Sequence, residues 1–578
     1  MVLTEAPRGT VPRLRRVARP HQQRERAALP LWAALVIAAG AGVVLDAAFP
    51  DRNWWVLAPV GPLMLFLALL GRGPWTGLLV GLVGGLSFWL THIFWITLYL
   101  GAVPWLALGG LQSIFFAIGL SLTAVVLRQG PRVWPSRLGR LAMVPVVVAG
   151  LWTAREAISA VWPYGGFAWG RVALSQSEGP LSPLASWVGL SGLSFLVVVV
   201  SALVLQLVRE PRAQAAPAVV GPALGAPTPG ILFRSTLVVA AVTALIVVPA
   251  FPIVESGTAR LAAVQGASDA GLFAQNEPGK ILNDHASATL PLIGEPVDFV
   301  VWPENASDID PMRSTDAARV ADYISAAMDA PLITGTITLQ DGTYYNSSLL
   351  WRNGEGAVDI YDKVHPVPFA EYMPDRAFWR PFAPELIDLI GRDYGIGSRD
   401  NVFDIDGIIA GIAICFDIAD DQLIHEMIDD DAEIILAQTN NADFGYTDES
   451  VQQLAIARLR AIETGRTVVN ISTVGTSAII TADGATLDQL PVWEPGSMVQ
   501  TVPLSSTITP AMALGRGLEW LLSGLGLAGL ALSLAARVSE RRASKRRSSQ
   551  PGGSGRRGPG AQKVPRPRSL GTVYSLGR

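Results

Sequence analysis

Long apolar runs fill the first half of the chain, and one more lies near its end. Seven runs between residues 31 and 253, and an eighth at 512–537, are long enough to cross about 30 Å of hydrocarbon as helices. They predict an α-helical membrane bundle of about eight transmembrane helices. The first seven predicted spans are 31–49, 54–71, 76–100, 103–128, 141–160, 184–208 and 232–253.

The stretch from residue 254 to residue 511 has a different pattern. Short runs rich in β-branched residues alternate there with polar stretches of helical character. This alternation is typical of an α/β domain whose sheet is buried on at least one face. The runs predicted as strands are RLAAVQG, VDFVVWPE, PLITGTITL, YYNSSLLW, GIIAGIAICFD, AEIILAQTNN, TVVNISTV and TSAIITADG.

Basic residues predict how the spans are oriented. Arginines crowd both ends of the chain, follow the second and fourth spans, and lie between the sixth and seventh. The positive-inside rule places these parts in the cytoplasm. A cleaved signal peptide is the alternative interpretation of the first span, but its apolar stretch is long and six more spans follow. The predicted parts are a basic cytoplasmic tail at 1–30, a seven-helix transmembrane region at 31–253, an extracytoplasmic domain at 254–511, a C-terminal transmembrane helix at 512–537 and a basic disordered cytoplasmic tail at 538–578.

Composition and charge agree with this division. The chain is 50% hydrophobic and only 16% charged, which favours a membrane protein. Residues 254–511 hold 13 Lys and Arg against 39 Asp and Glu, while the rest of the chain holds 31 against 9. Because contacts to phosphate need Lys and Arg, so acidic a domain argues against nucleic acid as its partner.

The single cysteine, Cys415, ends one of the predicted strands. A lone cysteine on an apolar strand is most often a small core residue. Here a helix is predicted to open between Asp417 and Asp421, and backbone dipoles at a helix N-terminus favour a thiolate, although nearby acids oppose it. A reactive thiol would also need a carboxylate to take its proton and a cation to hold a developing oxyanion.

Two other predicted strand ends offer such groups. VVWPE stops at Glu304, and YDKVHPVPFAEYMP contains Lys363 and Glu371. On its own, a glutamate after proline or a lysine after Tyr-Asp is usually a solvated loop residue. Together with Cys415, these residues supply a carboxylate, a cation and a thiol.

The three segments VVWPEN, YDKVHPVPFAEYMP and GIAICFD resemble the catalytic segments of the carbon–nitrogen hydrolase, or nitrilase, superfamily, in the chain order Glu, Lys, Cys. With seven spans before them and one after, they resemble the membrane-embedded apolipoprotein N-acyltransferase family. The segments Tyr345-Asn346-Ser347, ARLRAIETGRTVVNIST and YGGFAWGRVALSQ are also similar to that family. The resemblance implies a nitrilase-like α-β-β-α sandwich as the catalytic domain, with Cys415 as nucleophile, Glu304 as general base, Lys363 as oxyanion stabiliser and Glu371 as an additional active-site glutamate.

The resemblance also implies an activity and its partners. The enzyme would take an acyl chain from a membrane phospholipid as a thioester on Cys415. It would then pass the chain to the N-terminal amino group of S-diacylglyceryl-cysteine in an apolipoprotein, the final step of bacterial lipoprotein maturation. The expected location is the bacterial cytoplasmic, or inner, membrane. No metal or organic cofactor is expected, because the five histidines are scattered.

Two alternatives stay open. A membrane-anchored nitrilase-type amidase or hydrolase would use the same residues, with water as the second nucleophile. A catalytically inactive scaffold would hold a partner such as a polyprenol-phosphate mannose synthase, which in some actinobacterial relatives is joined to this module or works beside it. The presence of the Glu, Lys and Cys residues together argues against the scaffold.

The segment after Lys363 carries a large apolar load for a connection. It is interpreted either as a core helix or as a lid that touches lipid beside the site. Asp443, where the family commonly has tryptophan, is a further substrate-binding candidate. The apolar residues are Phe369, Tyr372, Met373, Phe378, Trp379, Phe382, Leu386, Ile387 and Ile390, of which Phe369, Tyr372, Phe378 and Trp379 are predicted to bind substrate.

An ionisable pair, Arg155 and Glu156, lies near the outer end of the fifth predicted span. Such a pair is costly in a membrane unless its members are paired or close to water. It is interpreted either as simple interfacial placement or as part of a lateral opening for lipid, shaped with Tyr164, Phe167 and Trp169.

Overall fold

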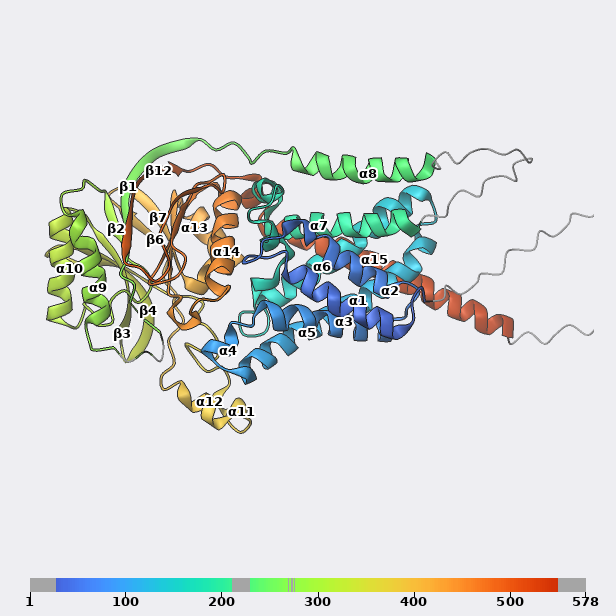
Figure 1. Cartoon of the computed structure of the whole chain (residues 1–578), viewed down its shortest axis with the longest axis horizontal. Coiled ribbons are helices and arrows are strands. Elements are labelled where there is room, and N and C mark those ends of the chain that lie inside the picture. The colour runs from blue at the N-terminus through green and yellow to red at the C-terminus, as the bar shows by residue number, and fades with distance from the viewer. Residues whose placement is uncertain (1–26, 210–228, 269, 272–273, 275, 549–578) are drawn as a thin grey trace, which may run out of the picture.

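A bundle of helices forms one end of the molecule and a two-sheet α/β domain forms the other (Figure 1). The computed structural model describes residues 27–209, 229–268, 270–271, 274 and 276–548. The arginines predicted to hold the N-terminal tail in the cytoplasm lie before residue 27, outside the described residues. Residues 549–578 of the basic C-terminal tail are also outside the described residues.

Fewer helices than predicted are long enough to span a membrane. Five stretches of the described residues are long and apolar enough to do so, in α3, α5, α6, α7 and α15. The first two predicted spans form shorter apolar helices, because α1 ends at Asp46 and a 3₁₀ turn precedes α2. The seventh forms α8, which lies beside α7 and ends at Ile246. The helices are α1 (Leu31–Asp46), α2 (Val60–Leu69), α3 (Pro74–His92), α4 (Ile96–Tyr99), α5 (Ala102–Val133), α6 (Val144–Val161), α7 (Ala185–Arg209), α8 (Pro229–Ile246) and α15 (Pro510–Ser548).

Two six-stranded sheets form the α/β domain. The first has the strand order β12-β1-β2-β3-β4-β5 and the second β11-β10-β9-β8-β7-β6. Strands β1, β2 and β3 are parallel in the first sheet, and β7, β8 and β9 are parallel in the second. The strands are β1 (Glu255–Gln265), β2 (Phe299–Val301), β3 (Leu332–Gln340), β4 (Thr343–Arg352), β5 (Gly356–Asp362), β6 (Val402–Ile405), β7 (Ile408–Ile414), β8 (Ile434–Thr439), β9 (Thr467–Ser472), β10 (Ala478–Ile480), β11 (Thr486–Gln489) and β12 (Gly496–Ser505).

Helices cover the outer faces of both sheets. α9 (Lys280–Thr289) and α10 (Thr315–Met328) pack on the first sheet, and α13 (Asp421–Asp429) and α14 (Glu449–Thr464) pack on the second (Figure 1). The facing sides of the two sheets bury a separate apolar core that includes Leu261, Phe299, Ile412 and Ile471. The predicted α-β-β-α sandwich is therefore confirmed.

The bundle and the domain share one continuous core. Leu190 of α7 and Ile424 of α13 belong to the same cluster of buried apolar residues, which runs from α1 through the bundle to the outer face of the second sheet. An ion pair crosses the same boundary: Arg171 binds Asp421 through two hydrogen bonds of 2.8 and 2.6 Å. Within the domain, Arg460 of α14 reaches the same carboxylate at 2.7 Å. The domain is therefore fixed to the bundle.

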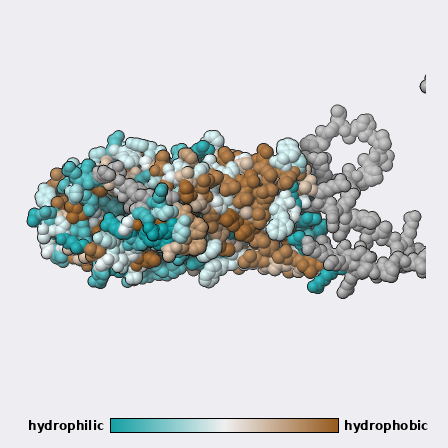
Figure 2. Space-filling view, turned by 90° about the horizontal axis from the view of Figure 1, so that it is seen from below, coloured by the Kyte–Doolittle hydropathy of each residue, from teal (hydrophilic) through white to brown (hydrophobic). Residues whose placement is uncertain are grey.

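Surface hydropathy divides the molecule in the same way. On the face that it shows, Figure 2 has an apolar belt across the bundle and a mostly hydrophilic surface on the α/β domain. Large apolar side chains on the bundle are exposed, including Trp32, Val36 and Leu98. Such a belt is typical of a surface in contact with lipid.

Candidate active site

Glu304, Lys363 and Cys415 each follow the end of a strand. β5 runs in the same direction as β2, since β3 is parallel to β2 and both β3–β4 and β4–β5 are antiparallel. The segments after β2 and β5 therefore leave the same edge of the first sheet, while Cys415 follows β7 of the second. Gly335 of β3 lets the Glu304 turn approach closely, because a Cβ there would lie 2.5 Å from the Pro303 carbonyl oxygen.

Lys363 lies between two carboxylates. Its Nζ is 3.2 Å from Glu304 Oε1 and 2.9 Å from Glu371 Oε2. Asn346 of β4 holds both acids, because its Nδ2 donates to Glu304 Oε1 at 2.7 Å and to Glu371 Oε1 at 2.8 Å. The main-chain N–H of Val367 completes the site by donating to Glu371. The structure thus brings together the three charged residues that the sequence singled out.

Burial and charge set the protonation of this group. Burial raises the pKa of Glu304, and the nearby Glu371 raises it further, while Lys363 and Asn346 act in the opposite direction. Burial by itself would lower the pKa of Lys363, but Glu304 and Glu371 outweigh it and raise that pKa well above the ordinary value. Lys363 is therefore a permanent cation, and Glu304 is a carboxylate with increased affinity for a proton.

Cys415 lies in a strained turn at the end of β7. Its φ is +52°, in the left-handed region that residues other than glycine rarely adopt. A 3₁₀ turn, Cys415–Ala419, follows it, and α13 begins at Asp421 with Asp420 as its N-cap, within the range predicted for the start of the helix. The thiol lies in the turn and not in the first turn of α13, so support from the dipoles of that helix stays a prediction. Burial raises the pKa of the thiol well above its ordinary value, Glu304 adds to the rise and Lys363 opposes it.

Asp417 fixes the turn that carries the thiol. Its carboxylate accepts hydrogen bonds from the Tyr361 hydroxyl at 2.9 Å and from the main-chain N–H groups of His365 at 3.1 Å and Ile414 at 3.2 Å. These bonds tie β7 to the segments that flank Lys363. The Lys363 ammonium group and the Cys415 thiol are thereby held on one rigid framework.

Aromatic residues of the bundle cover the Cys415 turn. Phe416 stacks on Trp169, with ring centroids 5.7 Å apart and planes at 5°, and Phe167 stacks on Trp169 in turn. The thiol therefore lies beside the boundary between domain and bundle. Beside Asp443, Phe444 contacts Trp95 and Tyr99, so the 3₁₀ turn Ala442–Phe444 also meets the bundle.

The apolar segment after Lys363 forms a small projecting arm. Two short helices, α11 (Arg376–Trp379) and α12 (Pro384–Leu389), stand away from the sandwich (Figure 1). The segment has a small core of its own, formed by Met373, Ile387 and Ile390 with Phe369 and Trp379 against it. Phe378 and Phe382 are 59% and 72% exposed. Neither interpretation of the segment, as a core helix or as a lid, describes all of its residues. Tyr372 is partly buried, and the side chain of Leu386 lies outside the described residues.

The Arg155–Glu156 pair is buried between helices. Arg155 Nη2 is 3.2 Å from Glu156 Oε1, and its guanidinium lies over the rings of Phe116 and Trp152. The two side chains are therefore paired inside the protein and not exposed on its surface, and their depth in the membrane stays a prediction. Tyr164 instead reaches the arm, because its hydroxyl donates to Asp375 at 2.7 Å. A lateral opening for lipid stays a prediction.

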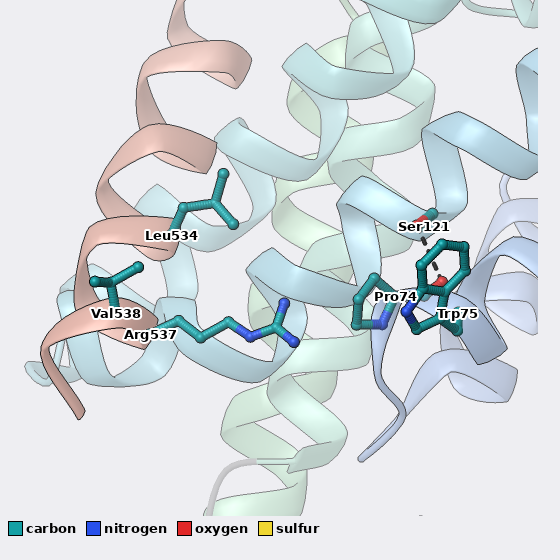
Figure 3. A pocket seen from close by; sticks show the side chains of 6 residues that line it. All are labelled: Pro74, Trp75, Ser121, Leu534, Arg537 and Val538. Atoms are coloured by element: carbon teal, nitrogen blue, oxygen red, sulfur yellow. Dashed lines mark hydrogen bonds between the residues drawn. The ribbon is translucent and has the colours of Figure 1, made fainter. Parts of the chain in front are cut away.

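The described residues contain a separate cavity of about 390 Å³ at the end of the bundle away from the α/β domain (Figure 3). It is bounded by α3, α5 and α15, and Ser121 Oγ donates to the Pro74 carbonyl at 3.0 Å within it. It contains none of the predicted site residues. No group of His, Cys, Asp and Glu among the described residues could hold a metal ion. The lining residues are Pro74, Trp75, Ser121, Leu534, Arg537 and Val538.

Comparison with known proteins gives the class. Residues 41–203 match the apolipoprotein N-acyltransferase N-terminal domain, and residues 260–510 match the carbon-nitrogen hydrolase model. Among solved structures, a Nesterenkonia amidase of the nitrilase superfamily is similar, with 15% identity, 46% of this chain and 97% of its own covered, and a TM-score of 0.34. The two family models, the α-β-β-α sandwich and the apolar bundle define a membrane protein that carries a carbon–nitrogen hydrolase domain.

Two relatives narrow the class further. An apolipoprotein N-acyltransferase of Mycolicibacterium smegmatis is 32% identical, over 90% of this chain and 88% of its own. Another, from Photobacterium profundum, is 25% identical over 86% of this chain and 94% of its own. The chain belongs to the apolipoprotein N-acyltransferase family.

Proposed function

We propose that this protein transfers an acyl chain from a membrane phospholipid, through a thioester on Cys415, to the amino group of the S-diacylglyceryl-cysteine of a lipoprotein. The observation that carries the proposal is the Lys363 cation between Glu304 and Glu371, on the same framework as a thiol beside the bundle. Membership of the family supports the substrates. The proposed parts are the bundle at 31–253 with 512–537 and the catalytic domain at 254–511.

Glu304 acts first as a base. It takes the proton of the Cys415 thiol, and the thiolate attacks the carbonyl carbon of the phospholipid ester. Lys363 balances the negative charge that develops on the carbonyl oxygen. The C–S bond forms, the ester C–O bond breaks, and the leaving alcohol takes the proton from Glu304.

The second half-reaction uses Glu304 in the same way, first as a base and then as an acid. The amine of the lipoprotein attacks the thioester, Glu304 accepts one of its protons, and Lys363 again balances the oxyanion. The N–C bond forms and the C–S bond breaks, so the amide leaves and the sulfur regains its proton. Glu371 and Asn346 hold the lysine and the base in place throughout.

A thioester assay tests the proposal. Incubation with labelled phospholipid alone should leave a hydroxylamine-sensitive acyl group on Cys415, and a diacylglyceryl-cysteine peptide should remove it. Lys363→Met should slow thioester formation about 10²- to 10³-fold, as expected when one oxyanion donor is lost. Lys280→Met is the matched control, because Lys280 is exposed on α9 and pairs there with Asp284. If Cys415→Ala transferred the acyl chain from phospholipid to the peptide at an unchanged rate, the proposal would be overturned.

Hydrolysis is the alternative activity, because the same thiol, base and cation would serve water as the second nucleophile. The two activities differ in what discharges the thioester. Loss of the acyl group to water at the same rate with and without the peptide amine would favour the hydrolase. The mannose synthase partner stays a prediction: neither relative is named for such an enzyme.

A further inference from the structure

The side-chain amide of Gln453 faces the sulfur of Cys415. Its Nε2 donates to Sγ at 3.5 Å. Gln453 lies in the second turn of α14 and is 1% exposed. A hydrogen bond donated to a sulfur stabilises the thiolate more than the thiol, and it is strongest where water is excluded. The contact therefore bears on the reacting atom.

A chain of donors fixes which way this amide points. The main-chain N–H of Gly475 donates to Ser472 Oγ at 3.0 Å, and Ser472 Oγ donates to Asn441 Oδ1 at 2.7 Å. Asn441 Nδ2 donates to Gln453 Oε1 at 2.8 Å. If the Gln453 amide were reversed, its NH₂ would meet the NH₂ of Asn441. The arrangement in the structure satisfies each pair and aims a Gln453 N–H at the sulfur.

Asn441 is itself held in one orientation. The second hydrogen of its Nδ2 goes to Glu449 Oε2 at 2.7 Å, so both hydrogens of this amide are used. A Cβ on Gly475 would lie 2.2 Å from Asn441 Oδ1, so only glycine leaves room for that oxygen. Asn441, Glu449 and Ser472 are all buried. The orientation is thus fixed by packing as well as by hydrogen bonds.

The charges around the thiol make such a donor useful. Burial, Glu304, Glu449 and Glu371 all raise the pKa of Cys415, and among the nearby charges Lys363 acts to lower it. Lys363 is shared between two carboxylates, so much of its charge is already balanced. A neutral donor that cannot be reversed stabilises the thiolate without adding a competing charge.

We propose that Gln453 is a catalytic residue that donates an N–H to the Cys415 thiolate, and that Asn441 and Ser472 are positioning residues that keep this N–H aimed at the sulfur. The proposal deepens the proposed function, because it rests on Cys415 as the nucleophile. It adds a residue of α14 to the groups that act on the thiol, beside those carried by the strand ends.

The full-length protein allows a direct test, because Cys415 is the only cysteine in the chain. The rate of alkylation by iodoacetamide is measured against pH, so the midpoint reports the thiol pKa and the plateau reports access. Gln453→Met keeps the bulk and removes the donor. Its midpoint should move up by about one pH unit or more, with alkylation at neutral pH about tenfold slower, as expected for one hydrogen bond to a charged group.

Gln452→Met is the matched control. Gln452 is the neighbouring buried glutamine on α14, but its amide bonds to the His92 carbonyl and to the Trp95 indole N–H, both in the bundle. It should leave the alkylation midpoint unchanged. An equal shift in both variants would show an effect of α14 packing and overturn the proposal, as would an unchanged midpoint in Gln453→Met.

A second variant keeps the test valid if Gln453→Met does not fold. Ser472→Ala removes the donor to Asn441 Oδ1 two links away from the sulfur, so its midpoint should shift in the same direction by a smaller amount. An unchanged midpoint there, in a folded protein, would contradict the positioning role. Alkylation needs no lipid substrate. If acyl transfer is absent while the midpoint still depends on Gln453, the proposed function fails and this inference stands.

Discussion

At the scale of single residues, the site depends on buried amides as much as on charges. Asn346 holds two carboxylates around Lys363, and Asn441 holds Glu449 and Gln453 beside the thiol. Each amide supplies two donors from one nitrogen and thereby fixes the orientation of groups on different elements. Their use spreads the positioning of the site over β4, the turn after β8, and α14.

Glu449 makes stability depend on pH. Its pKa is raised to about 8: burial is the main cause, the hydrogen bond from Asn441 opposes the rise, and the nearby Glu304 adds to it. In the unfolded chain the carboxyl ionises near 4.5. Between these values the folded protein holds a proton that the unfolded chain has lost. The free energy of unfolding therefore falls as pH rises through this window, by at most about 5 kcal/mol, and falls no further above it.

Glu449→Gln should remove this contribution. The thermal unfolding midpoint is measured in detergent for both proteins. The midpoint of the variant should rise relative to that of the unmodified protein as pH rises from about 5 to about 8. Both curves contain the other buried acids, so their difference isolates Glu449. Parallel curves would show that Glu449 is already ionised in the folded protein.

The sequence predicted the reacting groups but not the amides that hold them. Glu304, Lys363 and Cys415 stand out because their chemistry is rare at strand ends and their order matches a family. Asn346 and Gln453 are common polar residues whose importance comes from contacts 42 and 38 residues away. No local pattern encodes such distances, although Asn346 lies in a segment, Tyr345 to Ser347, that resembles the family.

At the scale of elements, the strands that the sequence missed are those at or near sheet edges. β5 and β11 expose much of their length, and β12 contains Pro503, which normally argues against a strand. The central strands were predicted because they are buried on both faces and read as continuous apolar runs. Edge strands carry no comparable signal.

The projecting arm offers a test at this scale. Phe378 and Phe382 are exposed, whereas Trp379 packs against Phe369 with ring centroids 5.8 Å apart. Replacing Phe378 and Phe382 together with serine should impair transfer from phospholipid, because apolar contact with the lipid is lost. Turnover of a small water-soluble ester and the thermal unfolding midpoint should change little.

Replacing Trp379 with serine is the contrasting variant. It removes the contact with Phe369 and the indole donor to the Tyr164 hydroxyl, so it should loosen the arm itself. If the double serine variant lost both substrates equally, the two phenylalanines would be structural residues of the domain, and the lid interpretation would be wrong.

At the scale of the whole molecule, the proposed orientation places the α/β domain outside the cytoplasm. The polar surface of the domain beside the apolar belt (Figure 2) places the domain outside the bilayer, and the side is predicted from the distribution of arginines alone. Alkaline phosphatase is active only outside the cytoplasm. Inserted after the exposed Gly294, it should be active, and fused after Arg578 it should be inactive. The reverse pattern would require the opposite orientation.

The pairing of β1 with β12 has a consequence for how the protein is made. β1 is the first strand of the domain to be synthesised, yet its antiparallel neighbour is the last, and four residues separate that neighbour from α15. Until β12 is made, one edge of β1 stays open, which is a hazard for aggregation. The first sheet is completed only as the final helix is synthesised. Closure of the domain and insertion of α15 thus become one late step of biogenesis, and a ribosome that stalls before residue 496 leaves the first sheet without its closing strand.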